Sequence, residues 1–193
     1  MSKHHQIYTK ILNFLIDAIL NKSSEFRNFV FSNINDGRVE SRYIVLRDFI
    51  EEDLNLIFFT DKRSPKLISI IKNNKTTCLF YSKTQKIQLR VTTESFILDD
   101  QKKIKKYWDE VPLISRKSYS TELPPSSFSN FETDGLIKET DSKNSEYKDS
   151  FKNFSVIENY IKEIDFLSLN SDGHRRARVS LDNKKFKLDW LIP

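Results

Sequence analysis

The chain has 193 residues, of which 38% are hydrophobic and 31% charged, and its formal net charge is +5. These proportions exclude an intrinsically disordered chain and predict one packed domain over residues 1–193. No apolar run reaches the roughly 20 residues of a transmembrane helix and the N-terminus lacks a signal-peptide pattern, so we expect a cytoplasmic protein without membrane association.

The positive charge alone does not indicate a nucleic-acid partner. Most of the basic residues are lysines interspersed with acidic residues, as on a solvated surface, so nucleic-acid binding is the less favoured interpretation. The single cysteine, Cys78, excludes a disulfide framework, and with only three histidines we expect no metal site. The three glycines do not form a nucleotide-binding motif, so any chemistry requires a cofactor.

The hydrophobic periodicities predict a mainly β protein with a few flanking helices. An amphipathic helix is expected over 7–20, and Asn35-Asp36-Gly37 is typical of a hairpin turn. We expect strands at 26–32, 38–49, 55–60, 76–81, 86–98, 154–160, 164–169, 175–181 and 185–191, helices at 64–74 and 99–112, and a long loop at 120–150. Many short strands adjacent in sequence suggest an antiparallel barrel.

Residues 41–66 give the strongest indication of a ligand. Two strand-like runs are followed by a helix start in which Ser64 is the N-cap and Pro65 the first helical residue. Clustered cations and helix N-termini favour bound phosphates. The residues expected to converge are Arg42, Arg47, Thr60, Arg63, Ser64 and Lys66. Strict alternation, however, places Arg42 and Arg47 on opposite strand faces, so each arginine could instead only shield the solvent side of its strand.

A second group of cations lies near the C-terminus. His174, Arg176 and Arg178 project from one face of a predicted strand, whereas Ala177 and Val179 face the core. Such a row could hold a phosphate or carboxylate. It could equally be a solvated edge that discourages strand pairing.

Several motifs, taken in order along the chain, resemble the pyridoxamine 5′-phosphate oxidase-like family of FMN-binding split barrels. Residues 42–47, RYIVLR, resemble its Arg-x-Val-x-Leu-Lys strand, and Phe59-Thr60 its Tyr-Thr pair. Residues 63–66, RSPK, are similar to its Ser-Arg-Lys helix start, and Gln88 to a glutamine near the flavin ring. The segments 107–108, 115–119, 166–167 and 190–193, and Arg178, resemble later parts of the family pattern. The resemblance is closest to the branch of short flavin-binding members.

This resemblance implies an antiparallel split β-barrel that binds FMN at a homodimer interface. The cofactor-binding residues that it implies are Arg42, Ile44, Val45, Leu46, Arg47, Phe59, Thr60, Ser64, Lys66, Gln88 and Arg178. The candidate substrate-binding residues are Tyr107, Ser115, His174 and Arg176. No catalytic residue is assigned.

The chain also departs from the family pattern. Pro65 replaces a phosphate-binding arginine, Arg47 a substrate-binding lysine, and Leu167 a frequent tryptophan, and the Arg-x-His pair that binds pyridoxal phosphate is not kept. We therefore expect an FMN-dependent oxidoreductase acting by hydride or electron transfer on an unidentified small molecule. The alternatives are a flavin sensor or carrier without turnover and, less favoured, a basic nucleic-acid-binding barrel.

Overall fold

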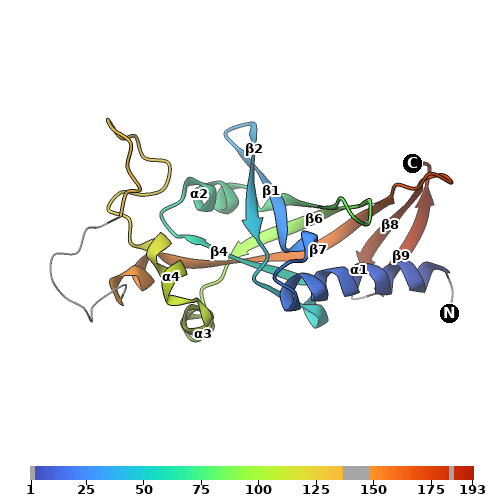
Figure 1. Cartoon of the computed structure of the whole chain (residues 1–193), viewed down its shortest axis with the longest axis horizontal. Coiled ribbons are helices and arrows are strands. Elements are labelled where there is room, and N and C mark those ends of the chain that lie inside the picture. The colour runs from blue at the N-terminus through green and yellow to red at the C-terminus, as the bar shows by residue number, and fades with distance from the viewer. Residues whose placement is uncertain (1–2, 137–147, 183–184) are drawn as a thin grey trace.

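A computed structural model describes residues 3–136, 148–182 and 185–193 and shows a nine-stranded antiparallel sheet flanked by helices (Figure 1). The strands are β1 (Asn28–Asn35), β2 (Arg38–Val45), β3 (Asp48–Ile50), β4 (Asn55–Asp61), β5 (Lys75–Ser82), β6 (Ile87–Ile97), β7 (Phe154–Ser168), β8 (Arg175–Asp182) and β9 (Lys185–Leu191). The helices are α1 (Lys3–Leu20), α2 (Pro65–Lys72), α3 (Gln101–Glu110) and α4 (Leu113–Arg116), with 3-10 turns at Glu25–Arg27, Glu51–Asp53, Lys117–Tyr119 and Lys148–Asn153.

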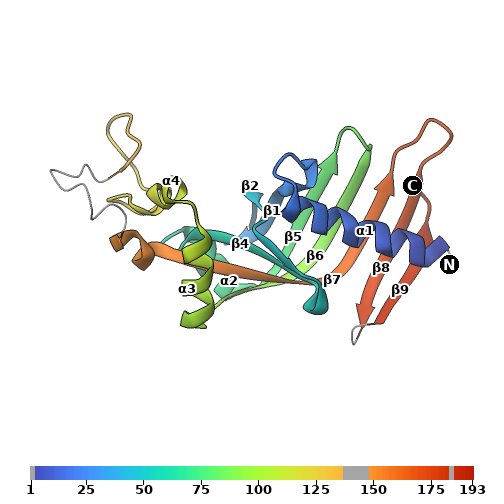
Figure 2. The same ribbon diagram turned by 60° about the horizontal axis from the view of Figure 1, so that its bottom comes forward.

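The sheet is curved like a barrel but is not closed. Its strand order is β2-β1-β5-β6-β7-β4-β3, and β8 and β9 extend from β7 as a separate wing. Strands β2 and β4 approach each other without pairing, which is the split of a split barrel. Helix α1 runs along the side that bears β8 and β9, whereas α3 and α4 lie toward the opposite end (Figures 1 and 2).

Two hydrophobic clusters hold this arrangement together. The larger fills the barrel with aromatic residues such as Phe29, Phe58 and Phe80, and α1 adds Ile11 and Leu15, all fully buried. The buried thiol of Cys78 belongs to the same cluster. The smaller cluster joins α3 to the other face of β4 and β7 through residues that include Trp108 and Phe154. Strand β4 therefore contributes side chains to both clusters.

Strand β7 changes both its partner and its side-chain phase midway. Its first half pairs with β4, from Phe154 to Tyr160, and its second half pairs with β8, from Glu163 to Ser168. Between them the register against β6 shifts, because Thr92 faces Glu163 and Thr93 faces Ile161. Lys162 is thus the extra residue of a β-bulge, which reverses the inward and outward alternation.

Most predicted elements are confirmed, with four corrections. The predicted strands 154–160 and 164–169 are one continuous strand, and the predicted strand 38–49 is broken between β2 and β3. Strand β8 lies between β7 and β9, so of the two alternatives left open for its row of cations, the solvated sheet edge is wrong. The first strand begins at Asn28, since Phe26 belongs to a 3-10 turn. The Asp36-Gly37 turn is confirmed, and both residues have positive φ.

Part of the predicted loop 120–150 has defined contacts. Thr121 and Leu136 form an isolated antiparallel bridge, and Lys148–Asn153 is a 3-10 turn. Residues 137–147 of this prediction lie outside the described residues. Across the described ranges, no helix combines the length and apolar character needed to span a bilayer.

Candidate functional site

Four of the predicted cofactor-binding residues meet at the split between β2 and β4. The Lys66 ammonium donates hydrogen bonds to Thr60 Oγ1 at 2.9 Å and to Ser64 Oγ at 2.6 Å. Arg42 projects from β2 close enough for its charge to act on Lys66. We call Arg42, Thr60, Ser64 and Lys66 the anion cluster.

The local sequence explains why the cluster forms at the start of α2. Ser64 is the N-cap, with extended backbone angles, and Pro65 starts the helix, as predicted. The Ser64 side chain makes no capping hydrogen bond, because it accepts the Lys66 ammonium instead. The arrangement therefore directs one hydroxyl and one ammonium toward the split.

Arg42 is fixed by two neighbours on the inner sheet face. Its guanidinium donates to the side-chain oxygen of Asn33 and, at 2.9 Å, to Glu40 Oε2. Asn33 is only 2% exposed, and its Nδ2 is a buried donor without a partner among the described residues. A buried donor that is not hydrogen-bonded costs free energy, so an acceptor is missing beside Arg42.

The electrostatics of Lys66 also indicate a missing anion. Burial, followed by the nearby charge of Arg42, lowers the pKa of Lys66 from 10.5 to about 8. Its hydrogen-bond partners are two neutral hydroxyls, and it forms no ion pair within the described part of the chain. The charges of Asp61 and Glu40 oppose this lowering of the pKa, and Glu40 is paired with Arg42, so the Lys66 ammonium itself is the group that a phosphate oxygen could pair with directly.

Arg47 lies apart from the anion cluster, on the other face of β4. Its guanidinium carbon is 5.7 Å from the centroid of the Phe59 ring, and this ring is 5.4 Å from that of Tyr107. The Tyr107 hydroxyl donates to Asp48 Oδ2 at 3.0 Å. Burial and the Asp48 charge raise the pKa of Tyr107, so this phenol stays protonated at neutral pH.

Arg63, the remaining cation of the predicted convergence, has a structural role. It donates to Asp61 at 2.7 Å and to the Thr121 carbonyl at 3.0 Å, which ties the loop after α4 to the end of β4. The convergence predicted for residues 41–66 is thus divided between the anion cluster, the Phe59 group and this loop contact.

The predicted flavin-contacting residues of β2 lie at an open sheet edge. Strand β2 is one end of the strand order and pairs with β1 alone among the described strands. Ile44 and Val45 are partly buried along this edge, whereas the side chain of Leu46 is fully buried in the core. The side chain of Leu46 is therefore not accessible to a ligand, and its backbone N–H already donates to the Arg27 carbonyl at 2.8 Å.

Gln88, Arg176 and Arg178 lie on the outer face of the sheet, away from the anion cluster. Gln88 and Arg176 both flank Leu167 across β6, β7 and β8. Arg176 donates to both oxygens of Asp165, at 3.0 and 2.8 Å, and Arg178 pairs with Glu163 at 3.4 Å. The predicted row of cations is confirmed for Arg176 and Arg178, but each of them is paired with a carboxylate of β7.

The remaining substrate candidates are dispersed. Ser115 lies in α4 and His174 is exposed in the turn before β8, and neither contacts the anion cluster. Sequence reasoning missed Asn33 and Asp48, which orient Arg42 and Tyr107. Asn33 carried a usable signal, since a polar residue on the buried side of an otherwise apolar strand demands a partner.

Comparisons with known proteins agree with this architecture. The family model described as "Pyridoxamine 5'-phosphate oxidase, FMN-binding domain" matches residues 6–99. None of the curated proteins matches the sequence. A solved pyridoxamine 5′-phosphate oxidase-related, FMN binding protein from Nostoc punctiforme is similar with a TM-score of 0.74 and 16% identity, over 96% of each chain.

Two other solved structures share the fold. PhzG from Burkholderia lata, in complex with tetrahydrophenazine-1-carboxylic acid, has a TM-score of 0.69 and 18% identity, over 96% of this chain and 92% of its own. A putative pyridoxamine 5′-phosphate oxidase from Listeria innocua has a TM-score of 0.51 and 17% identity, over 82% of this chain and 95% of its own. The matched segment 6–99 contains the whole anion cluster. Residues 6–99 therefore match the model of the pyridoxamine 5′-phosphate oxidase FMN-binding domain family, and the chain has the split-barrel-like fold of its structural neighbours.

Proposed function

We propose that this protein binds FMN and uses it in an oxidoreductase reaction. The observation that supports it best is the anion cluster, where Lys66 lacks an anionic partner among the described residues and Arg42 is hydrogen-bonded to Asn33, whose amide donor is unsatisfied. In this proposal Arg42, Ser64 and Lys66 hold the phosphate of the cofactor. When bound, FMN would supply hydride or electron transfer, which none of the surrounding side chains provides.

The remaining ligand contacts follow the open edge of β2. The ring system would lie along Ile44 and Val45 and reach the Phe59 side of the split. Tyr107, whose only O–H donates to Asp48, would offer its phenolic oxygen there as a hydrogen-bond acceptor, and Arg47 a positive charge for an anionic substrate. Each of these groups would bind or orient the substrate rather than transfer a proton to it.

We further propose that the active form is a homodimer. On the outer sheet face, Tyr43 and Tyr81 are 79% and 48% exposed, and Tyr81 lies opposite Gln88 in the β5–β6 pair. Exposed aromatic residues on one sheet face are typical of a protein interface. A second copy packed there would bring Gln88, and with it Arg178, to the FMN of its partner, which would explain why these residues lie apart from the cluster within one chain.

A second candidate function is a flavin sensor or carrier without turnover. It is favoured by the state of the residues that would bind a vitamin B6 phosphate. Arg176 is neutralised by Asp165, and His174 is exposed in a turn outside β8. Incubation with pyridoxine 5′-phosphate and oxygen, followed by detection of hydrogen peroxide, separates the two functions, because only an oxidase produces peroxide above the protein-free rate.

The visible absorption spectrum of the purified protein tests the shared proposal. We expect a flavin spectrum and, after heat release, a mass that identifies FMN at about one molecule per chain. A colourless protein that also fails to bind added FMN in equilibrium dialysis would overturn both the enzyme and the carrier proposal.

A further inference from the structure

A cavity lies between the N-terminal half of α1 and the inner face of the wing formed by β7, β8 and β9. Its volume is about 510 Å³, and its lining residues include Lys3, Ile7, Lys10, Phe166, Arg175 and Trp190. None of them belongs to the anion cluster or to the other residues assigned to FMN. We call this space the wing cavity.

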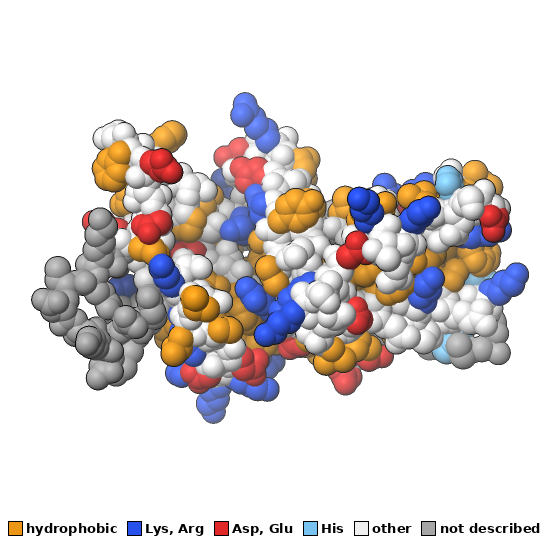
Figure 3. Space-filling view, in the orientation of Figure 1, with side chains coloured by type: hydrophobic (Ala, Val, Ile, Leu, Met, Phe, Trp, Pro, Cys, Tyr) orange, Lys and Arg blue, Asp and Glu red, His pale blue; other side chains and the backbone are white. Residues whose placement is uncertain are grey.

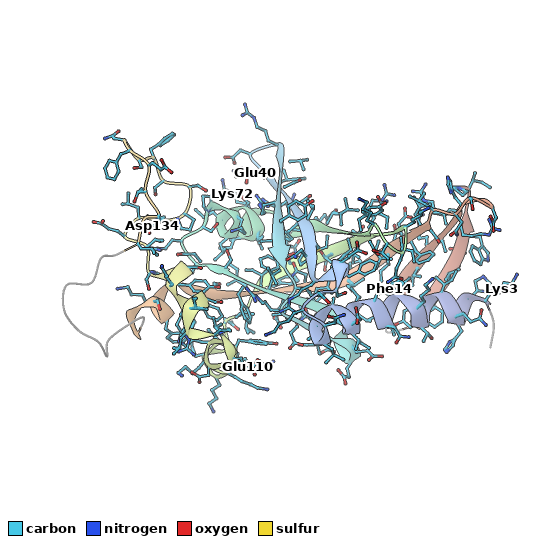
Figure 4. The ribbon with its side chains drawn as sticks, viewed as in Figure 1. Lys3, Phe14, Glu40, Lys72, Glu110 and Asp134 are labelled. Carbon is cyan, nitrogen blue, oxygen red and sulfur yellow. The ribbon has the colours of Figure 1, made fainter. Side chains whose placement is uncertain are left out.

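Ring contacts hold α1 against β9 beside the wing cavity. Tyr8 stacks on Phe186 with ring centroids 4.2 Å apart, and His4 lies 6.0 Å from the ring of Trp190. These contacts hold α1 against β9, while the neighbouring helical stripe of Lys3, Ile7 and Lys10 faces the cavity. Figure 4 labels Lys3 at the N-terminal end of this helix and Phe14 farther along it, with the wing beside the Lys3 end.

Along this stripe of α1, the residues change from lysines at the cavity to buried apolar residues beyond it. Farther along α1 the same side of the helix is apolar, and Ile11 and Leu15 are fully buried in the barrel. At the cavity it carries two lysines, although a helix face that covers a sheet is normally apolar. Both lysines are exposed, and the Lys10 ammonium lies 5.6 Å from the centroid of the Phe14 ring.

The charge of the wing cavity is uncompensated. Lys3, Lys10 and Arg175 contribute three positive groups, and no aspartate or glutamate lines the cavity. Arg175 Nη1 donates to the carbonyls of Gly173 and His174, each at 2.9 Å, and forms no ion pair with a described residue. These neutral acceptors orient the guanidinium and leave its charge available.

The floor and one wall of the cavity are aromatic. Phe166 is 3% exposed, whereas Trp190 is 47% exposed even though α1 covers this side of the sheet. In Figure 3 hydrophobic and basic side chains are mixed at this end of the molecule. An exposed indole beside several cations suits a ligand that has an apolar body and a negative charge.

We propose that the wing cavity binds a small carboxylate with a flat apolar body, of about the size of a naphthoate. The body packs against the exposed part of the Trp190 indole, and the carboxylate accepts hydrogen bonds from Arg175 and Lys10, with Lys3 at the entrance. Arginine and lysine donors to a carboxylate form the stronger class of hydrogen bond, so the charge contributes selectivity as well as affinity. This site is separate from the FMN site, and it does not depend on the proposed function.

Isothermal titration of the full chain with 2-naphthoate tests this site. We expect one naphthoate bound per chain, and at least about tenfold weaker binding of the uncharged 2-naphthylmethanol, as expected for the loss of one charge-assisted hydrogen bond. In the Lys10→Glu/Arg175→Glu variant, naphthoate binding should be lost and the cation 2-naphthylmethylammonium should bind instead. The Arg38→Glu/Lys83→Glu variant changes two exposed residues elsewhere by the same charge and should bind naphthoate like the wild type.

A further variant separates the wing cavity from the FMN site. Naphthoate affinity should be unchanged in Arg42→Ala/Lys66→Ala, provided that circular dichroism shows a folded chain. Failure of the wild type to bind naphthoate, equal binding of the uncharged analogue, or loss of binding in Arg42→Ala/Lys66→Ala would each overturn the proposal.

Discussion

Lys66 Nζ lies 2.6 Å from Ser64 Oγ, so the N-cap residue of α2 gives its hydroxyl to an ammonium from the first turn of its own helix. The helix thereby loses a capping interaction that typically stabilises by about 1 kcal/mol. In exchange, the hydroxyl fixes the position of the Lys66 ammonium, which is partly buried and whose hydrogen-bond partners are neutral. Such an arrangement favours ligand binding over folding stability.

The first prediction concerns the phosphate contacts. Arg42→Ala/Lys66→Ala should weaken FMN binding by about 100-fold or more, since each lost charge-assisted hydrogen bond is worth about 1.5–3 kcal/mol. Fluorescence titration of the apoprotein measures this. The matched control is Arg38→Ala/Lys72→Ala, which removes one exposed cation from the same strand and one from the same helix. Equal affinities in the two double variants would refute the phosphate assignment.

The second prediction uses Asn33, whose amide nitrogen has no partner among the described residues. Asn33→Asp places a carboxylate against Arg42 and repels a phosphate. FMN binding should weaken about tenfold or more, by roughly one charged hydrogen bond, whereas riboflavin, which lacks the phosphate, should bind as it does to the wild type. Parallel titrations with the two flavins measure the difference. An equal loss for both flavins would show that Asn33 does not face the phosphate.

The third prediction concerns pH and Lys66. The pKa of Lys66 is about 8 in the folded protein and has its ordinary value of 10.5 in the unfolded chain. Between pH 8 and 10.5 the unfolded chain therefore binds more protons than the folded protein. The free energy of unfolding consequently rises with pH across this range. The urea midpoint of Lys66→Met should therefore lack a rise between pH 7 and 9 that the wild type shows. The buried thiol of Cys78, whose pKa is raised to about 12, opposes this rise above pH 9, but it does so in both proteins.

The fourth prediction tests the charge group on the outer face. Asp165, whose side chain is 5% exposed, pairs with both Arg90 and Arg176. Its removal in Asp165→Ala should lower the free energy of unfolding by about 1–3 kcal/mol, because the partly exposed Arg176 and the exposed Arg90 lose charge-assisted hydrogen bonds to a buried carboxylate. The surface pair of Glu94 and Lys162 provides the control, and Glu94→Ala should cost about 0–1 kcal/mol. Similar urea denaturation curves for the two variants would contradict the structural importance of Asp165.

The fifth prediction concerns the homodimer. Tyr43→Glu introduces a charge into the exposed aromatic face of β2 and β5 and should convert the dimer into a monomer, as measured by light scattering after size exclusion. FMN retention should fall together with dimerisation. Ile114→Glu, at a residue that is 82% exposed on α4, should leave the mass unchanged. A monomeric wild-type protein, or a dimeric Tyr43→Glu, would refute the proposed interface.

Sequence reasoning could locate most of the fold because its signals are local. The Asp36-Gly37 turn, the Ser64-Pro65 helix start and the apolar alternation of β6 each depend on a few neighbouring residues. Asp100 caps α3 through hydrogen bonds to two backbone amides, which explains why the helix predicted from residue 99 begins at Gln101. The gap assigned between residues 160 and 164 was wrong as a strand boundary, but it coincides with the bulge, where the alternation reverses.

The candidate site was less accessible to such reasoning because its contacts depend on the register between distant strands. Arg42 meets Asn33 only through the β1–β2 pairing, and Tyr107 meets Asp48 across two elements far apart in the chain. Likewise, the neutralisation of Arg176 by Asp165 follows from β7 and β8 lying side by side. Spacing along the sequence identifies cations, but it does not reveal which of them have carboxylate partners.

The bulge at Lys162 has a consequence for how the chain tolerates insertions and deletions. Strand β7 pairs with β4 in its first half and with β8 in its second, and the side chains that face the core alternate in opposite phase in the two halves. The single extra residue Lys162 accommodates this change. Deleting that residue would force the two halves into a common phase, so that either Ile164 and Phe166 or Ile157 and Ile161 would point away from the barrel core. The number of residues in β7 at the bulge therefore determines which of its side chains face the core. We expect β7 to tolerate many substitutions more readily than the loss of one residue.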